Sequence, residues 1–233
     1  MQYKTILFDA DGTLLDFEAA QKHAFLSSCG QFQIPADTRL VEHYDKINRS
    51  LWAQLERKEI NRAQLLASRF RLFFEEAGIT DVDPDAFNRH YAQGLAHGFN
   101  LVEGAIPVLR ALQPHFQLAI ITNGIAQVQK SRLAGAGLDR YFSHIIISGE
   151  IGCEKPAADF FEQALLRCGV NDRAQALVVG DSLTADIAGG IGFGLDTCWY
   201  NPKGEPVPAH LQPTYIIDNL YTLLALLKIP AHS

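Results

Sequence analysis

The sequence predicts an α/β protein with a parallel sheet, interrupted after its first strand by a helical insert. Through residues 101–233, short apolar runs alternate with amphipathic segments of helical length, a pattern typical of βαβ units that build a parallel sheet. Between residues 16 and 100 the alternation stops, and apolar residues recur only at helical spacing. We therefore expect residues 1–15 and 101–233 to form one core, and residues 16–100 to form a helical domain inserted into it.

The first element is predicted to be a strand, and the insert after it is predicted to hold about four helices. Tyr3–Phe8 is short, apolar and β-rich, as a buried strand would be. Within the insert, the helical period is clearest in Tyr44–Leu55 and Leu65–Phe73. Three residues with capping side chains mark expected helix starts, namely Asp37, Asn61 and Asp83. Two glycines mark expected helix ends, namely Gly78 and Gly98.

After the insert, strands and helices are predicted to alternate to the end of the chain. The predicted helices are Val102–Leu112, Gln127–Ala136, Ala157–Arg167, Thr184–Gly190 and Leu220–Lys228. The predicted strands are Phe116–Ile121, His144–Ile147, Ala176–Val179, Leu195–Tyr200 and Tyr215–Ile217. Helices placed between parallel strands imply right-handed crossovers. The Pro-rich stretch Asn201–Pro213 is predicted to be a surface loop.

Composition excludes several classes of protein. The chain has 20 Lys and Arg against 26 Asp and Glu, a net charge of −6, which argues against binding to long nucleic acid. Its four cysteines form no C-x-x-C pair, so we expect reduced thiols in an intracellular protein. No stretch reaches the ~18 apolar residues of a membrane span, and the N-terminal apolar run is too short for a signal peptide. We therefore expect a cytoplasmic protein that does not enter membranes.

Polar motifs fall at or near the ends of four predicted strands. They are Asp9, Asp11 and Thr13; Thr122 and Asn123; Lys155 and Pro156; and Asp181 and Asp186. In an open parallel sheet, ligands bind outside the carboxyl ends of the strands. Each motif alone is weak, because acids at strand ends often cap the next helix. That explanation suits Asp186 but not Asp9, whose place after a buried strand requires a strong partner.

These residue types together predict phosphoryl-transfer chemistry. Carboxylates that converge from two loops form the hard-oxygen site that Mg²⁺ prefers. Beside a metal ion, Asp9 can act as the nucleophile that takes up the phosphoryl group. Asp11 lies two residues further on, where it could protonate the leaving oxygen and later activate water. The Thr122 hydroxyl and the Lys155 ammonium would then hold the phosphoryl oxygens.

The motifs resemble those of the haloacid dehalogenase-like (HAD) superfamily. The matching segments, in order along the chain, are D-x-D-x-T-L from Asp9 to Leu14, Thr122-Asn123, Lys155-Pro156 and G-D-S-x-x-x-D from Gly180 to Asp186. The resemblance implies a Rossmann-like core with a helical cap domain, a Mg²⁺ cofactor and an aspartyl-phosphate intermediate. It also implies that Asn123 contacts phosphate, that Asp9, Asp181 and the backbone carbonyl of Asp11 bind the metal, and that Asp186 supports it indirectly or through water.

Two details refine this resemblance. Asp11 marks the phosphatase branch, because the dehalogenases of the superfamily carry an aromatic residue there. Ala157-Ala158 departs from relatives that often place an Asp after the Lys-Pro pair, and we expect this to weaken a helix cap without changing the chemistry.

Further segments are similar to the pyrimidine 5′-nucleotidase subfamily. They are Leu15-Asp16-Phe17, Tyr44–Trp52 with Glu56, Ile60 and Arg69-Phe70, and Thr122-Asn123-Gly124 with Gln129 and Arg132-Leu133. This similarity implies removal of the 5′-phosphate from pyrimidine nucleoside monophosphates. The residues that could line a base pocket are Phe17, Asn48, Trp52 and Arg69. The alternative is that Trp52 and Phe70 only pack the interior of the cap domain.

Three classes of function remain open at this stage. The first is a 5′-nucleotidase, and the second is a phosphatase or phosphomutase acting on sugar phosphates or other small esters. The third is a non-catalytic phosphate-binding module. The presence of Asp9, Asp11, Lys155 and Asp181 argues against the third, because a pure binder requires no nucleophile. The sequence leaves open whether the protein is a monomer or a dimer.

Overall fold

The computed structural model describes residues 2–229. Within them the chain divides into two compact units. The first unit holds the chain up to Asp16 and from Phe99 onward, and the second holds Phe17–Gly98. Among the described residues, no helix combines the length and apolar character needed to cross a membrane.

A six-stranded parallel sheet forms the centre of the first unit. Its strands are β1 (Thr5–Phe8), β2 (Gln117–Thr122), β3 (His144–Ile147), β4 (Ala176–Gly180), β5 (Asp196–Tyr200) and β6 (Tyr215–Ile217). They lie in the order β3-β2-β1-β4-β5-β6, and every pairing is parallel. The chain therefore runs outward from β1 in both directions, which makes the end of β1 the switch point where ligands bind in such sheets. The predicted α/β fold is confirmed.

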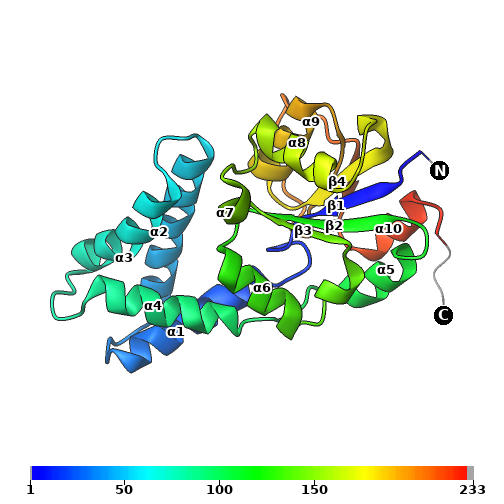
Figure 1. The fold of residues 1–233 in the computed structure, drawn as a ribbon. Helices are drawn as coiled ribbons and strands as arrows, with labels where there is room; N and C mark the ends of the chain where they lie inside the picture. The colour runs from blue at the N-terminus through cyan, green and yellow to red at the C-terminus, as the bar shows by residue number, and fades with distance from the viewer. Residues whose placement is uncertain (1, 230–233) are drawn as a thin grey trace. The chain divides into compact units, whose positions relative to one another are not determined.

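Helices cover both faces of the sheet (Figure 1). They are α5 (Ala105–Leu112), α6 (Ala126–Gly135), α8 (Ala158–Arg167), α9 (Gly189–Phe193) and α10 (Tyr221–Leu226). Side chains alternate along a strand, so Ile6 and Phe8 pack with α5, α6 and α10, whereas Leu7 packs with α8 and α9. This two-sided burial explains why the central strands are continuously apolar.

Several core elements differ in detail from their predicted bounds. The helix predicted from Val102 begins only at Ala105, because Gly104 adopts a left-handed conformation (φ 84°) that ends the preceding turn. The helix predicted at Thr184–Gly190 is a π-helix, Leu183–Ala188, followed directly by α9. The remaining short elements have no apolar period and were not predicted; they are α7 (Ser148–Ile151) and the 3₁₀ turns Asp139–Tyr141 and Arg173–Gln175.

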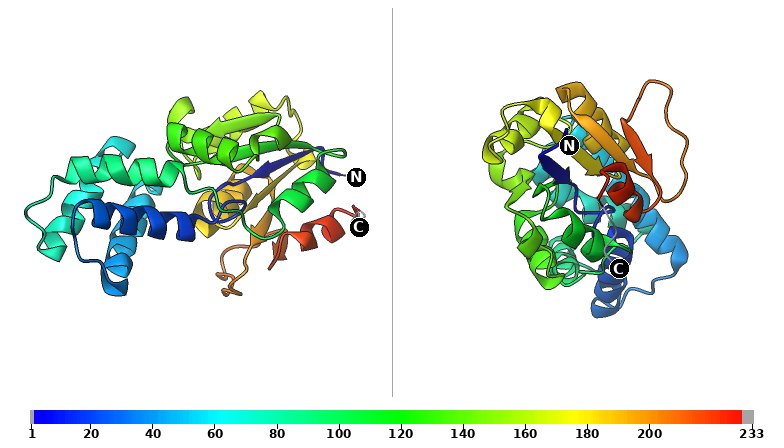
Figure 2. Two further views of the ribbon diagram at one scale, coloured as in Figure 1. Left: turned by 90° about the horizontal axis from the view of Figure 1, so that it is seen from below. Right: turned by 90° about the vertical axis from the view of Figure 1, so that its right-hand side faces the viewer.

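The predicted loop between β5 and β6 is confirmed. Residues 202–207 are all exposed, and the stretch up to β6 contains neither helix nor strand. Figure 2 shows it projecting beside the edge strand of the sheet. At the start of the loop, Asn201 Nδ2 donates to the Glu205 carbonyl oxygen and Glu205 N donates to Asn201 Oδ1, both at 2.9 Å.

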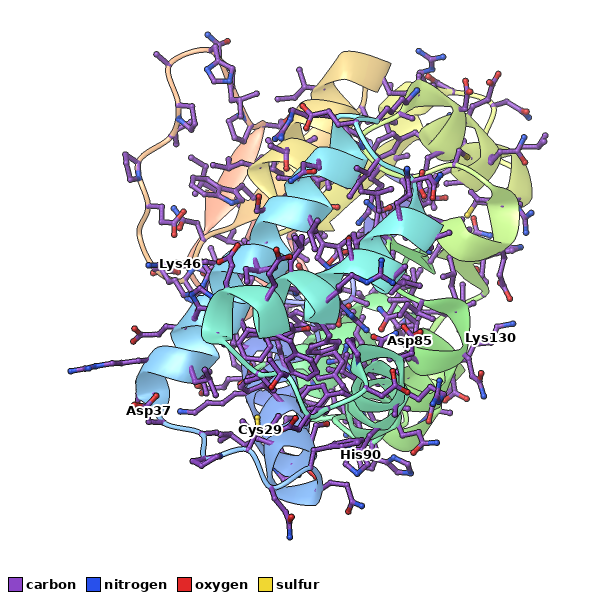
Figure 3. The ribbon with its side chains drawn as sticks, turned by 90° about the vertical axis from the view of Figure 1, so that its left-hand side faces the viewer. Cys29, Asp37, Lys46, Asp85, His90 and Lys130 are labelled. Carbon is purple, nitrogen blue, oxygen red and sulfur yellow. The ribbon has the colours of Figure 1, made fainter. Side chains whose placement is uncertain are left out.

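The second unit contains four helices, as predicted. They are α1 (Phe17–Gln31), α2 (Thr38–Glu56), α3 (Arg62–Ala77) and α4 (Pro84–Ala96). The three predicted starts are confirmed as N-caps, and Figure 3 labels Asp37 where α2 begins. Gly78 ends α3 in a left-handed conformation (φ 67°), and α4 ends shortly before Gly98. Stacked rings fill the interior, with Tyr44 between Phe25 and Phe70 at centroid distances of 4.8 Å on each side.

Candidate active site

The predicted strand-end motifs of the first unit meet at the carboxyl edge of the sheet. Asp9 follows β1, Thr122 is the last residue of β2, and Asp181 follows β4. The register places Phe8 opposite both Ile120 and Val179, so these three strands end side by side. Lys155 reaches the same place from the loop after α7.

Lys155 joins two buried carboxylates. Its Nζ donates to Asp9 Oδ1 and to Asp186 Oδ1, both at 2.6 Å, and to the Ile121 carbonyl oxygen at 2.9 Å. Asp9, Lys155 and Asp186 are 6%, 1% and 0% exposed. All three ammonium protons therefore have partners, and the strong partner that Asp9 requires is Lys155.

Burial and mutual charge control the ionisation of this cluster. Burial lowers the pKa of Lys155, but attraction and hydrogen bonds from Asp186 and Asp9 outweigh it, so the net pKa lies above its ordinary value. Burial raises the pKa of Asp9; Lys155 opposes this, and the negative charges of Asp186 and Asp181 add to it. One ammonium thus faces more carboxylates than it can neutralise, which favours a further cation.

Three carboxylates are arranged to accept that cation. One oxygen from each of Asp9, Asp181 and Asp186 lies within 4.8 Å of the others. Burial and the charge of Asp186 raise the pKa of Asp181 to about 7, so metal binding there competes with a proton. A set made only of carboxylate oxygens suits Mg²⁺, which binds through a few carboxylates and retains other oxygen ligands.

Neighbouring residues hold the carboxylates in place. Thr13 Oγ1 donates to Asp181 Oδ1 at 3.2 Å, and Trp199 Nε1 donates to the Asp181 carbonyl at 2.9 Å. Asp186 Oδ2 accepts from the backbone N–H of Ser182 at 3.1 Å. The π-helix supplies Asp186, consistent with the frequent occurrence of such helices at functional sites. Sequence reasoning missed Trp199, since a tryptophan in an apolar strand carries no signal beyond burial.

Gly12 packs directly against Asp181. It has a φ of 82°, and a Cβ at this position would lie 2.4 Å from Asp181 Oδ2.

We expect Gly12→Ala to destabilise the protein by about 1–2 kcal/mol through backbone strain. We also expect it to weaken the apparent affinity for Mg²⁺ by roughly 10–100-fold, because the Asp181 carboxylate must move. Metal titration of activity, together with thermal unfolding, measures both effects. Gly192→Ala is the matched control, since no atom lies within 4 Å of its added Cβ; equal metal affinity in the two variants would contradict the prediction.

A second network surrounds Asp11. Its Oδ1 accepts from Arg132 Nη1, and its Oδ2 accepts from Gln129 Nε2 at 3.0 Å. The same Gln129 nitrogen donates to Thr122 Oγ1 at 2.9 Å, and Gly124 N donates to that hydroxyl at 3.2 Å. In the sequence, Gln129 and Arg132 stand out only as members of a segment that resembles the nucleotidase subfamily. Their i, i+3 spacing on a helix was the available signal that they share a face.

The Asn123 side chain is engaged with the backbone of Lys155. Asn123 Nδ2 donates to the Lys155 carbonyl at 2.8 Å, and Lys155 N donates to Asn123 Oδ1 at 2.9 Å. This paired contact joins the end of β2 to the loop that carries the ammonium. The side chain predicted to contact phosphate thus holds Lys155 in this structure.

The predicted specificity residues lie in the second unit. Asn48 and Arg69 are each 2% exposed. Asn48 donates to Gln21, and Arg69 donates twice to Asn88 while its guanidinium lies 4.8 Å from the centre of the Tyr91 ring. Phe17 and Trp52 are only partly buried. Phe70 is 1% exposed and belongs to the interior of this unit.

Comparison with known proteins identifies a matching family and several similar proteins. Residues 3–194 match the family model for haloacid dehalogenase-like hydrolases. The chain is 36% identical to pyrimidine 5′-nucleotidase PynA of Streptococcus pneumoniae, covering 96% of this chain and 94% of that one. It is 33% identical to pyrimidine 5′-nucleotidase YjjG of Escherichia coli, covering 97% and 99%. The crystal structure of YfnB from Bacillus subtilis, bound to magnesium, has a TM-score of 0.92 at 36% identity, covering 98% and 100%.

Proposed function

Because the chain belongs to the haloacid dehalogenase-like hydrolases, we propose that it is a Mg²⁺-dependent 5′-nucleotidase that acts on pyrimidine nucleoside monophosphates through an aspartyl-phosphate. The single observation that carries this proposal is the position of Asp9. Its carboxylate lies at the switch point of the sheet, bonded to a buried ammonium and close to Asp181 and Asp186. A buried carboxylate so placed is suited to attack phosphorus.

The proposed reaction has two steps. In the first, a carboxylate oxygen of Asp9 attacks phosphorus, the ester P–O bond breaks, and Asp11 gives a proton to the leaving oxygen. In the second, water attacks the phosphorus of the aspartyl-phosphate and Asp11 takes a proton from that water. The bond between phosphorus and the Asp9 oxygen then breaks, which releases phosphate and restores the Asp9 carboxylate. The proton given in the first step is regained in the second, so both side chains return to their starting state.

The other residues of the site stabilise charge. The Thr122 hydroxyl accepts from Gln129 and Gly124, so its own proton is available to a phosphoryl oxygen. Lys155 brings a positive charge, and Asn123 holds the loop that carries it. Asp9, Asp181 and the Asp11 carbonyl would hold Mg²⁺, with Asp186 supporting them; the ion, when bound, neutralises phosphoryl charge.

We assign substrate recognition to the second unit, as the cap domain over residues 16–100. The nucleotide preference of PynA and YjjG, as their names give it, supports a pyrimidine nucleotide. Phe17 and Trp52 are partly exposed aromatic side chains, suited to contact a flat base. The packed positions of Asn48 and Arg69 suit them to support such a surface.

A substrate panel tests the proposal. With Mg²⁺, we expect dUMP, dTMP or UMP to have a higher kcat/KM than hexose phosphates, and EDTA to abolish hydrolysis until Mg²⁺ is restored. The reverse order of substrates would favour the alternative of a sugar-phosphate phosphatase. Absence of phosphate release from every ester in the presence of Mg²⁺ would reject the phosphatase reaction itself.

A further inference from the structure

Two buried side chains of α6 hold both carboxylate oxygens of Asp11. Arg132 is 0% exposed and Gln129 is 1% exposed, whereas the Asp11 side chain is 25% exposed. Arg132 Nη1 donates to one oxygen and Gln129 Nε2 to the other. A carboxylate held at both oxygens cannot rotate freely about its Cβ–Cγ bond. The two side chains of α6 therefore set the orientation of the Asp11 carboxylate.

Gln129 also ties Asp11 to the other side of the site. Its Nε2 donates to Thr122 Oγ1 as well as to Asp11, and its Oε1 accepts from Arg132 Nη1 at 3.3 Å. The turn after β2 closes over this amide, since a Cβ on Gly124 would lie 2.4 Å from Gln129 Cγ. The Gln129 amide therefore has little freedom to move. It connects Asp11, which would contact the leaving oxygen of a phosphate ester, with Thr122, which would contact a phosphoryl oxygen.

We propose that Arg132 and Gln129 are positioning residues that aim Asp11 at the leaving oxygen. The proposal rests on the proposed phosphatase function, in which Asp11 transfers the proton. Each carboxyl oxygen has two lone pairs, so it can accept a bond from α6 and still exchange a proton with the substrate. Proton transfer requires a heavy-atom distance of about 2.6–3.2 Å, and a carboxyl group held in one orientation satisfies that distance more often than a rotating one.

Dependence on the leaving group distinguishes positioning from a merely structural role. 4-Nitrophenolate leaves readily without a proton, whereas phenolate requires one, and the two aryl groups have nearly the same shape. With saturating Mg²⁺, kcat/KM reports the step in which the leaving group departs. We expect Gln129→Met to lower kcat/KM for phenyl phosphate by about tenfold or more, within the range that general acid catalysis contributes, and for 4-nitrophenyl phosphate by less than about threefold.

Further variants and a control complete the experiment. Arg132→Lys keeps the positive charge but loses the planar fork of the guanidinium. We expect it to lower kcat/KM for phenyl phosphate more than for 4-nitrophenyl phosphate. If this buried variant folds poorly, Gln129→Met alone decides the test. Adding Gln129→Met to Asp11→Asn should produce no further selective loss, because the glutamine acts through Asp11. Lys130→Met is the matched control on the same helix: Lys130 is exposed, pairs with Glu150 and points outward in Figure 3, so both rates should stay unchanged.

The outcomes separate this inference from the function on which it rests. An equal loss on both esters, or no loss on either, in folded Gln129→Met would overturn the positioning role while the wild type remains a phosphatase. If the wild-type protein hydrolyses neither ester with Mg²⁺, the proposed function fails as well. A faster reaction of phenyl phosphate in Gln129→Met would mean that α6 restrains Asp11 away from the leaving oxygen, which contradicts the proposal.

Discussion

Asp9→Asn is expected to lower the rate of phosphate-ester hydrolysis by roughly a thousandfold or more, because an amide cannot take up the phosphoryl group. Asparagine has the same shape, and Lys155 keeps its bonds to Asp186 and the Ile121 carbonyl. Burial raises the pKa of Asp9, so replacing a costly buried charge with a neutral group should leave the fold intact. Steady-state hydrolysis of 4-nitrophenyl phosphate with Mg²⁺ measures the rate.

The control for this substitution is Asp159→Asn, which makes the same chemical change at an exposed position in the first turn of α8. It should retain wild-type activity. Thermal unfolding of both variants establishes that they are folded at the assay temperature. Full activity in folded Asp9→Asn would exclude an aspartyl-phosphate at this residue and with it the proposed chemistry.

Lys155→Met is expected to destabilise the protein by about 3–5 kcal/mol, since it removes the cation between two buried carboxylates. Asp9 and Asp186 would then face each other with no positive charge between them. The raised pKa of Lys155 means that its contribution is fully present below its ordinary value of 10.5 and is lost only as the pH rises through the folded value. Denaturant unfolding at neutral pH in EDTA therefore measures the full effect.

Mg²⁺ should restore part of the stability of Lys155→Met, because the ion supplies positive charge to the same carboxylates. We therefore expect a larger Mg²⁺-dependent rise in Tm in this variant than in the wild type. Lys130→Met is the control, since it breaks only an exposed ion pair with Glu150, for which a loss below about 1 kcal/mol is expected. An unfolding free energy equal to that of the wild type in EDTA would show that the ammonium does not neutralise this cluster.

The local elements of the fold could be predicted from the sequence because their signals are local. An N-cap such as Asp37 bonds to Leu40, three residues away, so a few residues specify a helix start. Strand β1 is apolar because both of its faces are buried. The ends of elements depend on distant residues as well, and Gly104 is an example: a Cβ there would lie 2.9 Å from Cε2 of Tyr221, far along the chain.

The residues of the candidate site also divide into those that a sequence motif predicts and those that only the folded structure reveals. Asp9 and Asp181 stand in short motifs at the ends of neighbouring parallel strands, which bring them together, and Lys155 stands in a short motif in the loop after α7. Trp199 and Arg132 stand in no such motif, and a buried tryptophan or arginine has many explanations in a sequence. Their contacts to Asp181 and Asp11 depend on which strands are neighbours and on how α6 packs.

The residue pattern along the chain predicts the class of fold, a helical unit after the first strand, and the carboxylate, hydroxyl and ammonium groups of the candidate site. The contacts between these groups follow from the folded arrangement of the chain. Lys155 and Asp9 are separated by 146 residues along the sequence, and Arg132 and Asp11 by 121. Over such separations, the residue pattern does not indicate which side chains form a pair. Strand order and helix packing determine such contacts, because only the folded chain confines buried charges to the few partners that can neutralise them.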